Sequence, residues 1–143
     1  MEVREIMTSN PGCCSPETRL QEVAQLMVDR NCGEVPVIDN QGRPIGVITD
    51  RDIACRAVAK GMHPDVPVRE IMSSKVFTVT PDMSVADCCK TLEDNQIRRA
   101  PVVDDKGSCC GMVSQADIAL HAAEHQVAKV VREVSQPASK VCC

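Results

Sequence analysis

Two short stretches of the chain place a hydroxyl and a carboxylate three residues apart, directly after an apolar run. GVITDRDI contains Thr49 and Asp52, and GMVSQADI contains Ser114 and Asp117. A hydroxyl can donate to a phosphate or ribose oxygen, and an ionised carboxylate can accept from both hydroxyls of a ribose. If each hydroxyl starts a helix, the backbone N–H groups there also suit a phosphate. The pattern therefore indicates a nucleotide site.

The same spacing has a plainer structural interpretation. A Ser or Thr followed three residues later by an acidic residue resembles a capping box, which starts a helix without any ligand. For one copy taken alone, the capping box is the favoured explanation. The ligand hypothesis gains weight because the pattern occurs twice, at equivalent places in a repeat.

The chain consists of two copies of one pattern, related by a shift of 65 residues. VREIM at residues 3–7 recurs at residues 68–72, and one register holds without a gap. The same shift relates Pro16 to Pro81, Pro36 to Pro101, Val37 to Val102, Asp39 to Asp104, Gly42 to Gly107, Gly46 to Gly111 and Ala57 to Ala122. A match of this length predicts two structural repeats.

Each copy predicts the same order of elements: an extended lead-in, a helix, two strands and a second helix. The first helix should follow Thr18 in one copy and Ser84 in the other, because each residue has a capping partner three positions later. The strands VPVI and APVV come next. Gly42 and Gly107 in the turns after them should adopt positive φ before the second strands.

These elements predict an α/β (α+β) fold made of two βαββα repeats. Because one copy alone has only a marginal core, the two repeats should pack as a pair with pseudo-two-fold symmetry. The last helix should run from Ser114 past Val131. We assign residues 1–60 to the first repeat, 61–67 to a linker, 68–134 to the second repeat and 135–143 to a frayed tail. The expected buried helix faces are Leu20, Val23, Ala24, Met27 and Val28 in the first copy, and Val85, Cys88, Cys89 and Leu92 in the second.

Composition narrows the classes of function. The 143 residues are 43% hydrophobic and 25% charged, as in a globular protein, and the formal net charge is −4. The acidic balance and the lack of a Lys/Arg run argue against a nucleic-acid partner. No apolar run approaches the about 20 residues that span a bilayer, and the start MEVREIM does not resemble a secretory signal. We therefore expect a cytoplasmic location and no membrane partner.

Ten cysteines are the unusual feature, and eight of them form four Cys-Cys dipeptides. No Cys-x₂-Cys spacing indicates zinc, so we expect most of them to be reduced, small apolar residues. Cys142 and Cys143 resemble a double-prenylation ending, but the usual CaaX layout is missing. His121 and His125 have a spacing compatible with a metal on one helix, without further ligands to complete a site.

With PVID and GVITDRDI in one copy, and RRAPVVDDKG and GMVSQADI in the other, the chain closely resembles a tandem cystathionine-β-synthase (CBS) domain pair, or Bateman module. The resemblance covers nearly the whole chain and is to stand-alone bacterial CBS pairs, some of which are stress-response proteins with a similar ADIALHAAEH ending. It implies AMP, ADP or ATP as a regulatory ligand in the cleft between the repeats, and no tightly bound cofactor.

The resemblance also implies roles for particular residues. In CBS pairs the Asp of the turn holds the ribose, the hydroxyl supports ribose or phosphate, and the adenine lies between the lead-in and the first strand. Basic residues just before the Pro-Val strand reach the phosphates. The implied ligand-binding residues are Cys14, Val35, Thr49, Asp50, Arg51 and Asp52 in the first copy, and Val79, Thr80, Ile97, Arg98, Arg99, Ala100, Ser114, Gln115 and Asp117 in the second.

The first copy departs from this pattern. It has Gly33 and Glu34 where the second copy has Arg98 and Arg99, and a glutamate there would repel phosphate. The best remaining cation of the first copy is Arg51 within the turn. We therefore predict two unequal sites, of which the second is better equipped for a charged ligand.

A binding module is the leading hypothesis, with an unidentified effector protein and a homodimer formed through the last helix by Ile118, Ala119, Ala122 and Ala123. One alternative is a structural or protein-interaction dimer without a ligand. Another is a redox or metal responder that uses the cysteines. An enzyme is least favoured, because neither copy shows a nucleophile–base pair.

Overall fold

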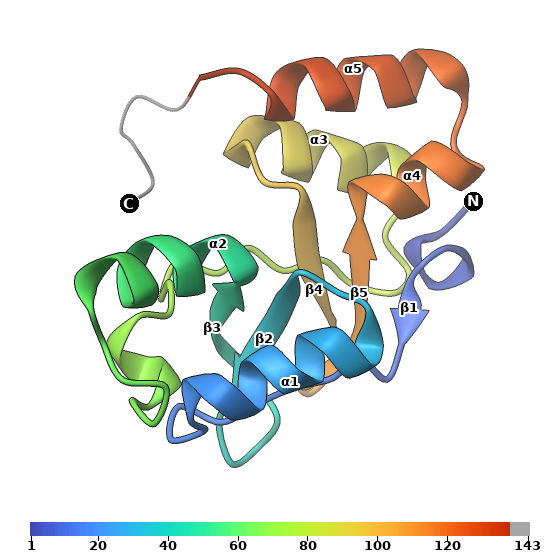
Figure 1. The fold of residues 1–143 in the computed structure, drawn as a ribbon. Helices are drawn as coiled ribbons and strands as arrows, with labels where there is room; N and C mark the ends of the chain where they lie inside the picture. Colours follow the sequence, from blue (N-terminus) through green and yellow to red (C-terminus); the bar gives the residue numbers. More distant parts are fainter. Residues whose placement is uncertain (138–143) are drawn as a thin grey trace. The chain divides into compact units, whose positions relative to one another are not determined.

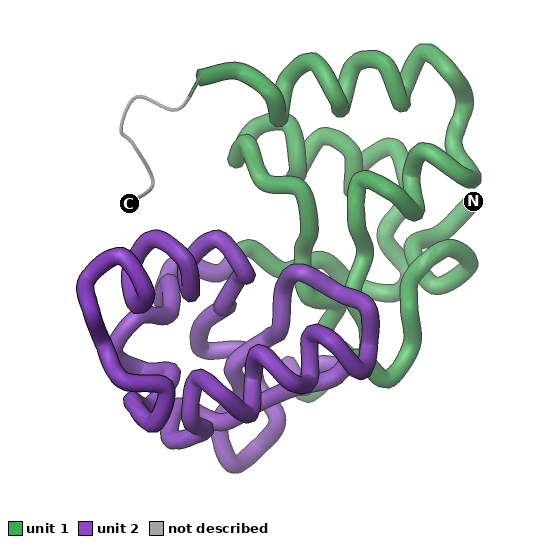
Figure 2. Tube along the Cα trace, in the orientation of Figure 1, with its two compact units in different colours: residues 1–11, 77–106, 110–142 green, residues 12–76, 107–109, 143 purple. Residues whose placement is uncertain are grey.

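The computed structural model describes residues 1–137 and confirms the mixed α/β fold predicted from the repeat (Figure 1). The chain forms two compact units (Figure 2). Unit 1 combines residues 1–11, 77–106 and the described residues from 110 onward, and unit 2 combines residues 12–76 with 107–109. None of the helices in the described part of the chain is long and apolar enough to cross a bilayer.

Unit 2 contains an antiparallel hairpin of strands β2 (Glu34–Ile38) and β3 (Pro44–Thr49). Gly42 in the connecting turn has a φ of 78°, which confirms the predicted positive φ. The lead-in of the first copy joins the hairpin through a parallel bridge between Cys14 and Val37. The helical elements are α1 (Leu20–Arg30), α2 (Asp50–Asp52), the π-helix η2 (Ile53–Ala57), and the 3-10 helices η3 (Val58–Lys60) and η4 (Val68–Glu70).

Unit 1 repeats this arrangement with an extra short strand. Its sheet has the order β1-β5-β4, and Val79 of the second lead-in bridges in parallel to Val102 of β4. Gly107 in the turn before β5 has a φ of 79°, again as predicted. The elements are η1 (Val3–Glu5), β1 (Thr8–Ser9), α3 (Val85–Asn95), β4 (Arg99–Val103), β5 (Cys109–Ser114), α4 (Gln115–His121) and α5 (Glu124–Val134).

The two VREIM segments are exchanged between the copies. Val3 and Ile6 of the first VREIM belong to the core of unit 1, which otherwise consists of residues from the second copy. Val68 and Ile71 of the second VREIM belong to the core of unit 2. The compact units in space are therefore not the same as the repeats along the sequence.

Gly46 and Gly111, which open the two repeated motifs, make this exchange possible. A Cβ at Gly46 would lie 2.9 Å from the Ser73 carbonyl oxygen and 2.8 Å from Met72 Sδ. A Cβ at Gly111 would lie 3.1 Å from the Thr8 oxygen and 2.7 Å from a methionine sulfur. Each glycine thus gives the segment after VREIM the room to pair directly with a strand.

The two predicted helix starts have different outcomes. Ser84 caps α3, since its Oγ accepts a hydrogen bond from Asp87 N at 3.0 Å, as predicted. Thr18 does not cap α1, which begins two residues later at Leu20. The physical reason is that the backbone carbonyls of residues 64 and 66 accept from the first amides of α1, at 3.0 Å each, and take over the role of a capping side chain.

The predicted buried faces are largely confirmed. All four predicted residues of α3 are buried, and so are Leu20, Val23 and Met27 of α1. Ala24 is half-buried. The prediction for Val28 was wrong, because its side chain is 73% exposed on the outer side of α1.

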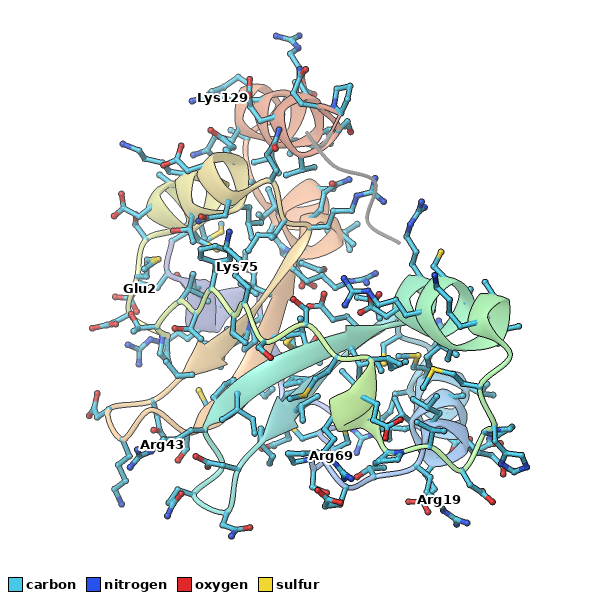
Figure 3. The ribbon with its side chains drawn as sticks, turned by 90° about the vertical axis from the view of Figure 1, so that its left-hand side faces the viewer. Glu2, Arg19, Arg43, Arg69, Lys75 and Lys129 are labelled. Atoms are coloured by element: carbon cyan, nitrogen blue, oxygen red, sulfur yellow. The ribbon has the colours of Figure 1, made fainter. Side chains whose placement is uncertain are left out.

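The predicted last helix is interrupted. Ala122 and Ala123 have extended backbone, with ψ of 166° and 146°, so that α4 ends before α5 begins. The break lets Ile118 of α4 enter the core while α5 packs on α3 with Val130 buried. Lys129 of α5, labelled in Figure 3, pairs with the nearly buried Glu93 at 3.1 Å. Residues 138–143 of the predicted frayed tail lie outside the described residues.

Replacing Gly46 with alanine should lower the free energy of unfolding by about 1–3 kcal/mol, because the new methyl group collides with a backbone carbonyl that cannot move without breaking the β3 pairing. Urea unfolding followed by far-UV circular dichroism measures this, since the chain has no Trp or Tyr. Gly12→Ala is the matched control, because its methyl group would meet only the movable end of the Leu26 side chain. Equal effects of the two variants would contradict the close-approach explanation.

Candidate functional site

The turn at the end of β3 forms a capping box in unit 2. Asp52 N donates to Thr49 Oγ1 at 3.0 Å, and Thr49 N donates to Asp52 Oδ2 at 3.0 Å. The second oxygen, Asp52 Oδ1, lies 3.7 Å from Arg56 Nε. Both carboxylate oxygens of the first turn thus already face a partner within the protein.

The turn at the end of β5 has the same geometry in unit 1. Asp117 N donates to Ser114 Oγ at 3.2 Å, while Ser114 N and Ser114 Oγ both donate to Asp117 Oδ2 at 2.8 Å. The other oxygen, Asp117 Oδ1, makes no hydrogen bond or ion pair within residues 1–137. Asp117 is a half-buried residue, and its Oδ1 oxygen is the main difference between the two turns.

Each turn is hydrogen-bonded to the residue that precedes the first strand of its hairpin, β2 in unit 2 and β4 in unit 1. Asp50 N donates to the Gly33 carbonyl at 2.9 Å, and Gln115 N donates to the Arg98 carbonyl at 2.8 Å. The structure therefore brings the backbone of Arg98, and with it the neighbouring Arg99, to the turn of Ser114 and Asp117. Both arginine side chains are exposed and form no ion pair with any described residue.

The residues assigned to the base lie mostly in the cores. Val35, Val79 and Ala100 are at most 1% exposed, and Cys14 is 7% exposed. Their side chains pack against other apolar groups, so in this structure they belong to the hydrophobic cores of the two units. Ile97 is half-buried against the core of unit 1.

Thr80 is the exposed polar residue among those predicted around the base. Its Oγ1 donates to Asp82 Oδ1 at 2.6 Å, and this hydrogen bond holds the pKa of Asp82 below its usual value. Gln115 is a second polar residue at the site. Its Oε1 is buried and has no hydrogen-bond partner in the described part of the chain, which leaves an unused acceptor beside the turn.

Arg56 is the site residue that the sequence analysis missed. It lies one turn beyond Asp52, at the i,i+4 spacing that favours an ion pair on a helix, and this spacing was the available signal. The equivalent position of the second copy is His121, whose Nδ1 contacts the Asp117 carbonyl oxygen at 2.9 Å. Among the described residues, no cation pairs with the carboxylate of Asp117 as Arg56 does with that of Asp52.

Two hollows in unit 2 contain residues of the predicted first site. One, of about 660 Å³, is lined by Cys14 and by residues 15–18, 38–40 and 45, as well as Cys13. The other, of about 330 Å³, is lined by Asp50 together with apolar residues of α1 and Ile53. Arg51 is exposed on α2, next to Asp50 in the sequence.

Several cysteines serve as core residues, as expected. Burial raises the pKa of Cys14 to about 12, and the nearby charge of Cys13 adds to the effect. Burial likewise raises the pKa of Cys88 to about 12, with smaller contributions from Cys89 and from the carboxylate of Asp117. These thiols are neutral at physiological pH and contribute as small apolar groups.

The fold and the doubled turn define the class of protein. The chain belongs to the CBS-domain family, whose model matches residues 3–58 and 68–124. CBS domain-containing protein YhcV of Bacillus subtilis (strain 168) is 39% identical over 119 residues, which is 83% of this chain and 84% of YhcV. Hypoxic response protein 1 of Mycobacterium tuberculosis is 30% identical over 135 residues, which is 94% of either chain.

Two solved structures show the same fold with bound groups. The CBS domain pair of protein MJ0100, in complex with 5′-methylthioadenosine and S-adenosyl-L-methionine, has a TM-score of 0.76 and 28% identity, covering 84% of this chain and 98% of that chain. Hypoxic Response Protein I with two coordinated zinc ions has a TM-score of 0.77 and 29% identity, covering 86% of this chain and 100% of that chain.

In the part of the chain that the structure describes, the side chains do not gather into a metal site. No group of three or more His, Cys, Asp and Glu side chains that could hold a metal occurs within residues 1–137. The predicted one-turn spacing of His121 and His125 was wrong, because the break at Ala122 and Ala123 places them on different helices.

Replacing Ser114 with alanine should lower the free energy of unfolding by about 1 kcal/mol, because the first amides of α4 lose their side-chain cap. Urea unfolding monitored by circular dichroism measures the change. Ser74→Ala, at an exposed position outside any cap, is the control and should be nearly neutral. A Ser114→Ala variant as stable as that control would show that the capping box contributes nothing.

Proposed function

We propose that this chain is a non-catalytic regulatory module that binds an adenosine-containing ligand, with its principal site at the turn of Ser114 and Asp117. The observation that carries this proposal is the Asp117 carboxylate oxygen that has no partner among the described residues, in a turn whose backbone is hydrogen-bonded to Arg98. Arg98 and Arg99 are exposed and have no ion-pair partner in the same part of the chain. A carboxylate oxygen suits ribose hydroxyls, and guanidinium groups suit phosphate.

The other polar groups at this turn fit the same ligand. The Gln115 side-chain oxygen is a buried acceptor without a partner, which a donor such as the adenine amino group can satisfy. Ser114 Oγ already serves the backbone as a cap, but a hydroxyl has two acceptor lone pairs and can serve the ligand as well. The adenosine ligands of MJ0100, a relative of the same fold, support this ligand class.

The first turn should bind more weakly. Asp52 faces Arg56, so a ribose must compete with an ion pair, and Glu34 stands where the second copy has Arg99. We propose that Thr49 and Asp52, with the exposed Arg51 in the same turn, form a secondary site for which a ligand with little negative charge is better suited. AMP, ADP and ATP therefore favour the second turn.

Isothermal titration calorimetry with AMP, ADP, ATP, S-adenosylmethionine and 5′-methylthioadenosine tests the proposal. Asp117→Asn should weaken the main binding event by tenfold or more, since a hydrogen bond to a charged group is worth about 1.5–3 kcal/mol. Asp52→Asn should have a smaller effect, and Asp105→Asn, on an exposed turn of the same unit, should have none. If a folded protein gives no binding heat with any of these ligands, the ligand-free interaction module would be favoured.

The phosphate assignment has its own readout in the same experiment. The double variant Arg98→Gln and Arg99→Gln should weaken AMP and ATP but leave 5′-methylthioadenosine, which has no phosphate, unchanged. An equal loss for both ligands would mean that the arginines support the fold of the turn instead of contacting phosphate.

We also propose a homodimer, through the exposed face of α4. Ile118 is excluded from this face because it is fully buried in the core, which corrects the sequence-based assignment. Of the other residues assigned from the sequence, Ala119 and Ala123 are exposed, whereas Ala122 packs partly against the core of unit 1. Leu120, which was not among them, is 78% exposed on α4. In sedimentation velocity, Leu120→Asp should lower the dimer fraction, while the exposed control Lys90→Asp on α3 should not; a dimer unchanged in Leu120→Asp would place the interface elsewhere.

A further inference from the structure

Two cysteines from opposite halves of the chain meet in unit 2. The thiols of Cys13 and Cys109 are in hydrogen-bond contact, and both residues are half-buried. Neither is in a disulfide in this structure. Cys13 also lines the open hollow of about 660 Å³ described above, so a small solute has access to it.

The backbone holds both cysteines against the same hairpin. Next to Cys13, Cys14 accepts a hydrogen bond from Ile38 N of β2 at 2.8 Å. Cys109 N donates to the Gly42 carbonyl at 2.8 Å, in the turn between β2 and β3. Backbone hydrogen bonds thus hold both cysteines against the same hairpin, β2–β3 and its turn.

The two sulfurs of the Cys13-Cys14 dipeptide differ. The hydrogen bond from Cys109 lowers the pKa of Cys13 against the opposing effect of burial, and the charge of Arg30 at the end of α1 assists. Burial raises the pKa of Cys14 and of Cys110 instead. Cys13 is therefore a better nucleophile than its neighbour Cys14.

We propose that Cys13 and Cys109 are an oxidation site, which forms an intrachain disulfide on reaction with a hydroperoxide. The Cys13 thiolate attacks the peroxide O–O bond; an S–O bond forms, the O–O bond breaks, and the leaving oxygen takes a proton. The Cys109 sulfur then attacks the Cys13 sulfenic acid; the S–S bond forms, the S–O bond breaks, and water leaves with the Cys109 proton. Both sulfurs are oxidised, and the peroxide is reduced.

This bridge joins the lead-in of the first copy to the segment 107–109, which immediately precedes the part of β5 that belongs to unit 1. A cross-link between such distant residues restricts the unfolded chain and should raise the thermal stability of the oxidised protein. The proposal does not depend on nucleotide binding.

The test uses the full chain, reduced and then exposed to stoichiometric hydrogen peroxide, blocked with N-ethylmaleimide, digested with trypsin and analysed by mass spectrometry. Cys13 and Cys109 lie on different tryptic peptides, so the bridge appears as one cross-linked pair. We expect this pair in the wild type and in Cys110→Ser, and its loss in Cys13→Ser and in Cys109→Ser. A monomer band on a non-reducing gel distinguishes it from a bridge between chains.

Two outcomes would overturn the proposal: no cross-linked pair in the oxidised wild type, or a pair that persists in Cys109→Ser. Arg30→Gln provides a variant that keeps all thiols, and it should slow the oxidation without removing the product. Circular dichroism of every variant before oxidation shows that a lost cross-link is not a lost fold.

Discussion

The structure depends on the direct backbone pairing between each motif strand and the segment that follows a VREIM sequence. Val47 N donates to the Ser73 carbonyl at 2.9 Å, and the reverse bond has the same length. In unit 1, Gly111 is opposite Ser9 in the pairing of β1 with β5. A side chain at either glycine would push the segment away, and with it the buried Val and Ile residues of VREIM. One missing Cβ per repeat therefore determines which part of the chain completes each core.

Much of the fold follows from local patterns in the sequence. The gapless repeat predicts the order of elements, the turn glycines predict positive φ, and the apolar spacing of α3 predicts its buried face. The cap of α1 was not predictable in this way, because carbonyls from residues 64 and 66 replace the side chain. Nor was the break at Ala122, since alanine favours helix and only the packing of α5 on α3 opposes continuation. The exchange of VREIM segments also depends on tertiary contacts, and the spacing of apolar residues along the sequence does not predict it.

The two interpretations of the repeated turn prove compatible. Both turns are capping boxes, as the plain interpretation predicts, and the same hydroxyl and carboxylate remain the groups that a ribose would meet. The sequence predicts the inequality of the turns from Arg98 and Arg99 alone. The structure adds that Arg56 occupies one carboxylate, whereas His121 at the equivalent position contacts a backbone carbonyl. The cap thus holds each turn in a fixed conformation. A cation next to the turn then determines how much of the carboxylate charge a ligand can use.

The interleaving of the chain has a consequence for the order of folding. Unit 2 is formed almost entirely by the continuous residues 12–76, whereas unit 1 needs residues 1–11 together with residues from 77 onward. During synthesis residues 1–11 are made before residues 77 onward, so Val3 and Ile6 remain unburied until the second copy has been made. Closing that long loop is the slow, entropically costly step of assembly. A fusion at the N-terminus would act on this step and leave the formation of unit 2 unaffected.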